Sequence, residues 1–236
     1  GDEIMTDAPD VAPPSAAAST AAKDWRVCLQ DWLKTNPKTM PEGARKLLDE
    51  FRQNFPLDKF NEMTIDEYVA GKPDSFCYWL EFKTKDLGSI SGGSASKFGV
   101  FWSPKDNVYH WRKSFRTSTP EEAFAIIKQG FIALFDATEK GQFDNLDKIG
   151  AASLGPYSNS LRIKPLYMYF PDQFLPISSP DHLAYFLTSF GAKPADDVTR
   201  ANRQLLELIR ALPEFAGFDT QQMMRFLYAC LPPGAV

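Results

Sequence analysis

Large parts of the chain place apolar residues at the three- and four-residue spacing of an amphipathic helix. Near the N-terminus, Trp25, Leu29 and Trp32 fall on one stripe, which Pro37 ends. Residues 64–67, TIDE, form a capping box, a typical signal for the start of a helix. Such signals predict helices over residues 25–33, 42–55, 64–71, 119–135, 179–191, 199–211 and 219–230.

Other stretches alternate apolar and polar side chains with the period of two that is typical of a strand. The sequence FCYWLEF at 76–82 predicts a strand with one apolar face. Residues 161–170 alternate again, and Pro165 favours an edge strand there. Residues 97–103 and 108–115 are rich in aromatic residues and flank a PKDN turn, which predicts a β-hairpin.

Together these elements predict an α+β fold. We expect a small, mostly antiparallel sheet with an aromatic hairpin, packed by N-terminal and C-terminal helices. Residues 1–22 are rich in Ala, Pro and Ser and have too little large apolar surface to offset the entropy of ordering. We therefore expect a disordered tail over 1–22 and a single α+β domain over 23–232, helical from about residue 179.

Composition narrows the class of protein. The chain is 44% hydrophobic and 14% aromatic, enough to build a sizeable core. It contains no run of 18 apolar residues, so we expect no membrane partner. Cys28, Cys77 and Cys230 lie far apart. An odd number without short spacings argues against a disulfide framework and a zinc cluster, and favours a cytoplasmic protein.

The charge of the chain is unevenly distributed. The net charge is −4, and residues 1–23 carry a net charge of −3. Residues 81–116 carry seven Lys and Arg against three Asp and Glu, a net charge of +4. A basic middle region therefore lies in an acidic chain, and the overall charge does not reveal it.

The sequence GSISGGSASK at 88–97 has the composition of a phosphate-binding loop but not its order. In that loop, Lys and Ser/Thr directly follow the second glycine. Here Gly88 and Gly93 have the right separation, but Ser94 occupies the position of the lysine. We therefore expect no bound nucleotide and no other cofactor. Two interpretations stay open: a plain turn, or close backbone approach to a phosphate, with Lys97 supplying charge.

The hairpin region combines flat rings with cations. Aromatic stacking and pairing with phosphates are the interactions that hold unstacked nucleic acid or a flipped base. The structural alternative is that the aromatic residues form core or cross-strand pairs and the cations form a solvated face. The candidate residues are stacking rings, phosphate-contacting cations and positions of close backbone approach: Trp102, Tyr109 and Trp111; Lys97, Arg112, Lys113 and Arg116; Ser91, Gly92 and Gly93.

A metal-dependent nuclease is a further hypothesis. Asp74 follows a proline, and Glu81 and Lys83 come next in the PD…(D/E)-x-K pattern, in which two carboxylates hold Mg²⁺. Glu81 and Lys83 would share one face of the predicted strand. The short spacing between Asp74 and Glu81 leaves no room for the hairpin that this chemistry normally requires, which makes the nuclease the weakest of the functional hypotheses.

Three segments resemble, in the same order, segments found ahead of the motor domain in McrB-like AAA+ restriction ATPases. They are SFCYWLEFKTKDLGSISGGSASKFGVF (75–101), LYMYFPDQFLPISSPDHLAYFLTSFG (166–191) and ANRQLLELIRALPEFAGFDTQQMMRFLY (201–228). The resemblance implies a defence system against modified DNA. In such a system, a variable N-terminal region recognises DNA, an ATPase ring moves it and a separate nuclease cuts it. Some of these regions flip a modified cytosine into an aromatic pocket.

These observations favour a non-catalytic DNA-recognition domain of a McrB-type restriction system. A modified base is one candidate target, and the resemblance implies an AAA+ motor and a separate nuclease as partners. The alternative is a protein-interaction or sensor module of a defence complex. The nuclease is the third hypothesis.

Overall fold

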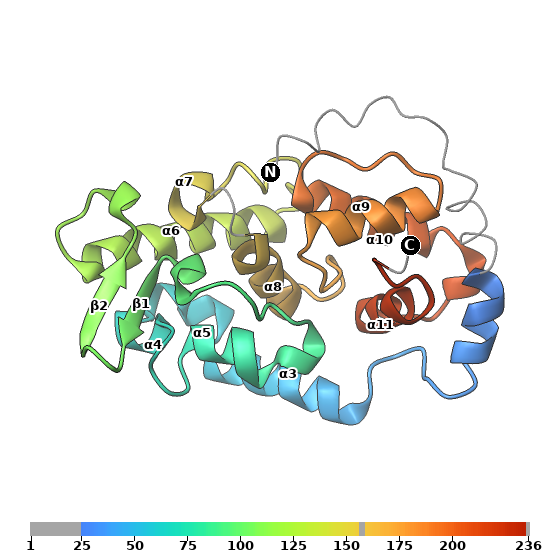
Figure 1. Ribbon diagram of the computed structural model, residues 1–236, viewed down its shortest axis with the longest axis horizontal. Helices are drawn as coiled ribbons and strands as arrows, with labels where there is room; N and C mark the ends of the chain where they lie inside the picture. The colour runs from blue at the N-terminus through green and yellow to red at the C-terminus, as the bar shows by residue number, and fades with distance from the viewer. Residues whose placement is uncertain (1–24, 156–158, 235–236) are drawn as a thin grey trace. The chain divides into compact units, whose positions relative to one another are not determined.

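A computed structural model describes residues 25–155 and 159–234 (Figure 1). The chain falls into two compact units. We call residues 42–169 the hairpin unit, and residues 25–41 together with 170–234 the terminal unit. The tail predicted at 1–22 lies outside the described residues. The prediction of one domain over 23–232 stays a prediction, because compact units need not fold separately.

Two helices of the hairpin unit begin at threonine caps that the sequence predicts. The Thr64 hydroxyl accepts a hydrogen bond from the Glu67 N–H (3.3 Å), and the Glu67 carboxylate accepts one from the Thr64 N–H (3.1 Å). At the start of the longest helix of this unit, the Thr119 hydroxyl accepts a hydrogen bond from the Glu122 N–H (3.2 Å). The helices are α3 (Glu42–Asn54), α4 (Ile65–Tyr68), α5 (Phe76–Tyr78), α6 (Pro120–Glu139), α7 (Ala151–Leu154) and α8 (Asn159–Tyr169).

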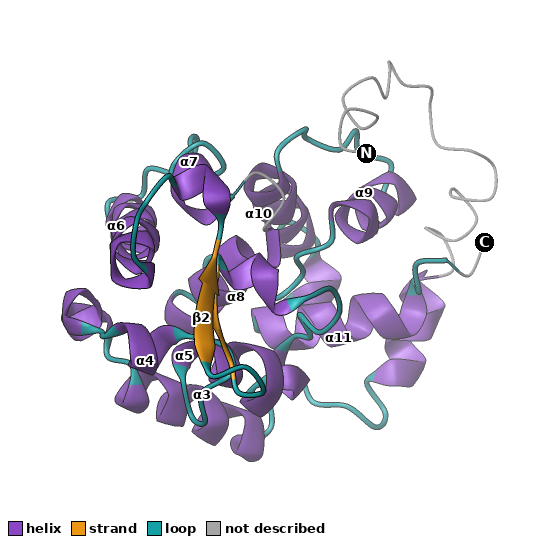
Figure 2. Cartoon of the chain, turned by 60° about the vertical axis from the view of Figure 1, so that its left-hand side comes forward, coloured by secondary structure: helices purple, strands orange, loops and turns teal. Residues whose placement is uncertain are grey.

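The predicted hairpin is confirmed. Strands β1 (Val100–Ser103) and β2 (Val108–Trp111) pair antiparallel, with Phe101 opposite His110 and Trp102 opposite Tyr109. Both strands contact α6, and Figure 2 brings the hairpin to the front of the view. The small antiparallel sheet among helices confirms the α+β fold class.

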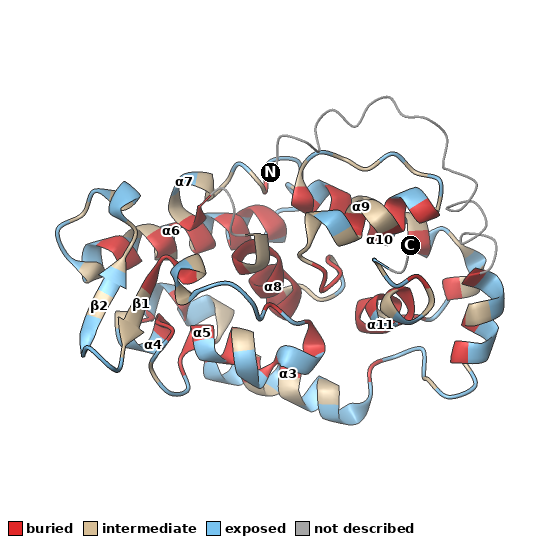
Figure 3. Ribbon diagram, in the orientation of Figure 1, coloured by how far each residue is buried: buried red, intermediate tan, exposed pale blue. Residues whose placement is uncertain are grey.

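The core of the hairpin unit is a cluster of aromatic rings. Phe60, in the 3-10 turn Leu57–Glu62, lies within 5.3–5.6 Å of the rings of Phe76, Phe131 and Phe135. The aromatic edges and faces pack in T-shaped and tilted contacts, as their quadrupoles favour. Figure 3 shows buried positions along α6 and over nearly all of α8. The many phenylalanines therefore build a core.

The strand predicted at 76–82 is wrong. The segment forms α5 and then a π-helical turn over Trp79–Lys83. Ser75 caps it, because its hydroxyl accepts a hydrogen bond from the Tyr78 N–H (3.1 Å). A short apolar run fits a helix as well as a strand, and here the cap favours the helix.

The strand predicted at 161–170 is also wrong, because residues 159–169 form α8 with Pro165 inside it. All residues from 161 to 169 are buried, including Arg162 and Lys164. The alternation that indicated a strand was the alternation of polar and apolar side chains. It does not mark faces in a helix that is buried on all sides.

The terminal unit is helical, as predicted. Residues 25–32 form a helix, followed by α9 (Pro180–Ser189), α10 (Val198–Arg210) and α11 (Thr220–Cys230). Trp25 packs against Phe215 and Phe226, with ring centroids 5.4 and 6.3 Å apart. The buried Asn202 amide bonds the backbone of residues 175 and 177. The terminal unit therefore has an aromatic core of its own.

The expectation about cysteines is wrong in part. Cys28 and Cys230 are joined by a disulfide across 202 residues of sequence. It links the first described helix to the end of α11, within the terminal unit. Sequence spacing did not reveal this pair, because partners so far apart meet only through the tertiary fold. Cys77 is free and buried.

Candidate nucleic-acid interface on the hairpin

Burial alternates along β2. Tyr109 and Trp111 are half-buried, whereas Val108 and His110 are exposed. The strand register places Trp102 on the face of Tyr109 and Trp111, and Phe101 on the face of His110. The predicted stacking rings therefore lie on the less exposed face of the hairpin.

The Trp102–Tyr109 pair has a cation beside it that the sequence did not indicate. The Lys72 Nζ lies 4.0 Å from the centroid of the Trp102 ring and 5.9 Å from that of Tyr109. It also lies 3.8 Å from the Asp66 Oδ1. The Tyr109 hydroxyl donates a hydrogen bond to the same carboxylate. Desolvation first, and then Asp66, raises the pKa of Tyr109 to about 12.

The loop that carries Lys72 lies tightly against β1. The Trp102 N–H donates to the Ala70 carbonyl (2.8 Å), and Ala70 bridges to Phe101. Gly71 has φ +96°, and a Cβ there would overlap the Trp102 carbonyl oxygen. Glycine is therefore required for this approach, which brings Lys72 over the rings.

The other ring pair of the hairpin is open. Phe101 and His110 stack with centroids 5.0 Å apart and ring planes at 21°. His110 is exposed and Phe101 half-buried. Alternation along β2 could have indicated this face, whereas the predicted stacking rings lie on the opposite one.

Trp111 is held at the base of the hairpin. Its Nε1 donates to the Thr117 carbonyl (3.4 Å), just ahead of α6. The indole therefore has an internal partner for its one polar group.

Lys97 is directed into the Gly/Ser loop (residues 88–97) rather than away from the protein. Its Nζ donates to the carbonyls of Ile90 (2.6 Å) and Gly92 (2.9 Å) and pairs with Glu81. The loop folds around the ammonium. Ser91, Gly92 and Gly93 are exposed, as close approach to a phosphate would require, but the nearest charge already has carbonyl and carboxylate partners.

The guanidinium of Arg112 also binds backbone carbonyl groups. It donates to the Lys97 carbonyl (3.3 Å) and lies against Gly155, where a Cβ would overlap it. Burial lowers the pKa of Arg112. Arg112 thus fastens the end of the Gly/Ser loop to the hairpin.

Lys113, in the 3-10 turn Lys113–Phe115 that follows β2, and Arg116, directly after this turn, are both exposed. The predicted set thus separates into groups: rings on the hairpin, two cations (Lys97 and Arg112) that bind carbonyls of the Gly/Ser loop, and two exposed cations after β2. Lys72 and Asp66 lie about 30 residues or more before their ring partners, and no local pattern in the sequence marked them.

The nuclease hypothesis loses its geometric premise. Glu81 and Lys83 lie in a helical turn, so residues two apart do not share a face. Glu81 pairs with Lys97, and the Lys83 Nζ lies 5.4 Å from the centroid of the Trp79 ring. Within residues 25–155 and 159–234, no three His, Cys, Asp or Glu side chains are grouped to hold a metal ion.

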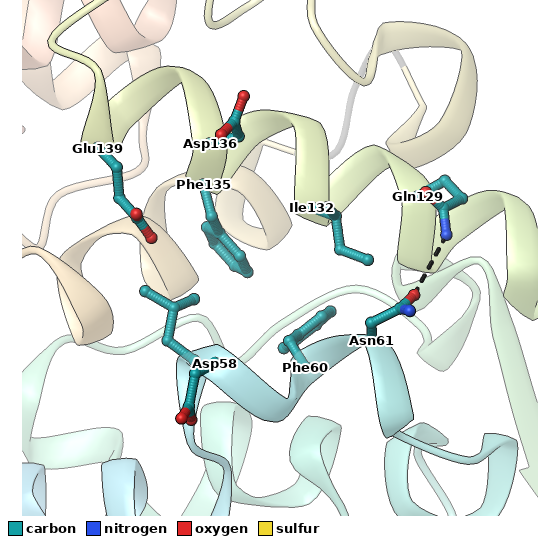
Figure 4. A pocket seen from close by; sticks show the side chains of 9 residues that line it. Asp58, Phe60, Asn61, Gln129, Ile132, Phe135, Asp136 and Glu139 are labelled. Carbon is teal, nitrogen blue, oxygen red and sulfur yellow. Dashed lines mark hydrogen bonds between the residues drawn. The ribbon is translucent and has the colours of Figure 1, made fainter.

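A groove of about 410 Å³ lies elsewhere on the hairpin unit, between the Leu57–Glu62 turn and α6 (Figure 4). Phe60, Ile132 and Phe135 line its floor, and Glu139 reaches over one end. A hydrogen bond from Gln129 to Asn61 (3.4 Å) spans the other end. Polar and apolar side chains therefore line the groove about equally, and Glu139 gives one end a negative charge.

No family model, curated protein or solved structure matches the chain. In the part of the chain that the structure describes, no helix combines the length and apolarity needed to cross a membrane.

Proposed function

We propose that the hairpin unit recognises DNA, without catalysis, through the β1–β2 hairpin. The observation that carries this proposal is the open Phe101–His110 ring pair on a two-stranded ribbon that is followed by the exposed cations Lys113 and Arg116. A two-stranded ribbon fits the major groove, and an open flat pair suits an unstacked base.

Within this site we propose other roles for the residues than the sequence predicted. Trp102 and Tyr109 lie on the less exposed face of the hairpin, with Lys72 against them, so we propose Phe101 and His110 on the more exposed face as the stacking pair. Lys97 and Arg112 hold the Gly/Ser loop in shape. We propose that Lys113 and Arg116 contact the phosphates, together with Lys105, a third exposed cation at the hairpin turn.

The biological setting of the proposal rests on the sequence resemblance. A McrB-type restriction system would supply an AAA+ motor and a separate nuclease, and a modified cytosine would be the target. We also propose a cytoplasmic location. The Cys28–Cys230 disulfide provides a test of it, because cytoplasmic thiols are usually kept reduced. In freshly lysed cells treated with a thiol-alkylating reagent, Cys28 and Cys230 should be alkylated if the protein is cytoplasmic. If the disulfide keeps both cysteines from being alkylated, the result would argue against a cytoplasmic location.

Fluorescence anisotropy tests the DNA proposal. A labelled duplex, the same duplex with modified cytosine, and one of its single strands are titrated at several salt concentrations. The Lys113→Gln variant should weaken binding to all three and reduce the salt slope by about 1. The His110→Ala variant should cost about 1–3 kcal/mol on the single strand.

Lys46→Gln is the matched control, because Lys46 is an exposed lysine of the same unit, on α3. An equal loss in Lys46→Gln, or no binding at low salt, would contradict the proposal.

The groove favours a protein-interaction module as the second candidate. Its mixed lining, with Ile132 on one side and Glu139 at one end, suits a partner segment with an apolar residue followed by Lys or Arg. A Glu139→Lys variant should then lose that partner while keeping its DNA affinity. Asp49→Lys, on the exposed side of α3, is the charge-matched control.

A further inference from the structure

Two aromatic walls and a carboxylate surround one ammonium group on the hairpin. Trp102 and Tyr109 face each other across the strands, with centroids 4.7 Å apart and ring planes at 68°. The Lys72 Nζ lies 4.0 Å from the Trp102 centroid and 3.8 Å from Asp66. We call Trp102, Tyr109 and Asp66 the ammonium seat.

The ammonium seat is rigidly built. The strand register fixes the two rings, and Asp66 lies in the first turn of α4, behind the Thr64 cap. The Tyr109 hydroxyl donates to Asp66, so one wall and the carboxylate hold each other. Glu121, whose charge contributes to raising the pKa of Tyr109, adds a second negative charge nearby. Such a field favours a cation and disfavours a phosphate.

The present occupant is weakly held. The Lys72 side chain is 29% exposed and that of Asp66 58% exposed. At such exposure, a cation–π contact and an ion pair each contribute little, because water competes for both charges. A second cation can therefore compete for the same place.

We propose that the ammonium seat binds an alkylammonium group of a ligand, and that Lys72 is an internal occupant which this ligand displaces. The ligand chemistry is that of a lysine side chain, methylated or not, or of a small quaternary amine. A methylated ammonium is less strongly hydrated, so it gives up less when it moves between two rings. This binding goes beyond the proposed DNA recognition, because its ligand is a cation whereas DNA is an anion.

NMR titration of the whole chain tests the proposal through the indole N–H of Trp102. The probes are acetyl-trimethyllysine methylamide, its neutral isostere with carbon in place of the ammonium nitrogen, and choline. Lys72→Ala should bind trimethyllysine about five- to thirty-fold more tightly than the unchanged chain, because the competitor is gone. Asp66→Asn in the Lys72→Ala background should weaken that binding.

Lys46→Ala, which removes an exposed lysine from α3 of the same unit, should leave the affinity unchanged. Tighter binding of trimethyllysine than of choline supports a protein ligand, and equal binding supports a small amine. Equal affinity for the neutral isostere, or no gain in Lys72→Ala, would overturn the proposal. Neither of these two results would decide the proposal of DNA recognition, because the DNA titration tests variants of other residues.

Discussion

Burying the charged side chain of Lys164 costs free energy of folding. This cost should be measurable as a dependence of stability on pH. The Lys164 Nζ donates to the carbonyls of Thr84 (2.8 Å) and Gly88, and burial lowers its pKa from 10.5 to about 7. Below pH 7 both the folded and the unfolded states are protonated, and the cost of burial is fully present. Between pH 7 and 10.5 the unfolded state binds more protons, so the cost falls as the pH rises.

The free energy of unfolding, compared with that of Lys164→Met, should therefore rise by about 1.4 kcal/mol per pH unit between pH 7.5 and 9.5. Urea denaturation of both proteins at several pH values measures this difference. The corresponding difference for Lys46→Met, at an exposed site on α3, should stay flat. A flat difference for Lys164→Met would mean that the buried amine does not titrate in this range.

Three cations bind carbonyls of the Gly/Ser loop. Lys164 binds its first residue, Lys97 binds residues 90 and 92, and Arg112 binds residues 96 and 97. The sequence correctly located positive charge around this loop. It did not reveal that these charges serve the loop itself, because partner choice depends on tertiary contacts that local spacing does not encode.

At the scale of elements, prediction succeeded where a local signal was decisive. The Thr64 and Thr119 caps and the PKDN turn each determine a start or a reversal through contacts within a few residues. It failed at 161–170, where residues 161–169 are all buried and periodicity carries little information, and at 76–82, where a short apolar run fits a helix as well as a strand. The ammonium seat was missed for a related reason, since its parts come from separate elements.

The Cys28–Cys230 disulfide should stabilise the terminal unit. It closes a very long loop, with partners 202 residues apart, so its loss frees much chain entropy in the unfolded state. Cys230→Ser should lower the free energy of unfolding by about 2–5 kcal/mol, as followed by urea denaturation. A reductant should lower the stability of the unchanged chain similarly and leave that of Cys230→Ser unaltered. Equal stability of the two chains without reductant would contradict the prediction.

At the scale of the whole molecule, the first and last helices of the hairpin unit pack against each other. Its first helix, α3, contacts its last helix, α8. The Arg52 Nε donates to the Met168 carbonyl (2.9 Å), and the Tyr169 hydroxyl donates to the Phe55 carbonyl (2.6 Å). The rings of Phe51 and Tyr169 pack with centroids 5.4 Å apart. The contacts that complete the core of the hairpin unit therefore all lie within residues 42–169.

We accordingly expect residues 42–169 to fold when they are produced alone, because the contacts that join α3 to α8 lie inside this range. The measurement is a cooperative urea transition, with dispersed NMR signals for the indole N–H groups of Trp102 and Trp111. Under the proposed function, this fragment should also keep the DNA affinity of the whole chain. Residues 56–169, which lack α3, form the matched control and should not fold, because the Phe51 and Phe55 rings are then missing from the core. Equal stability of the two fragments would show that the contact between α3 and α8 does not determine the independence of the unit.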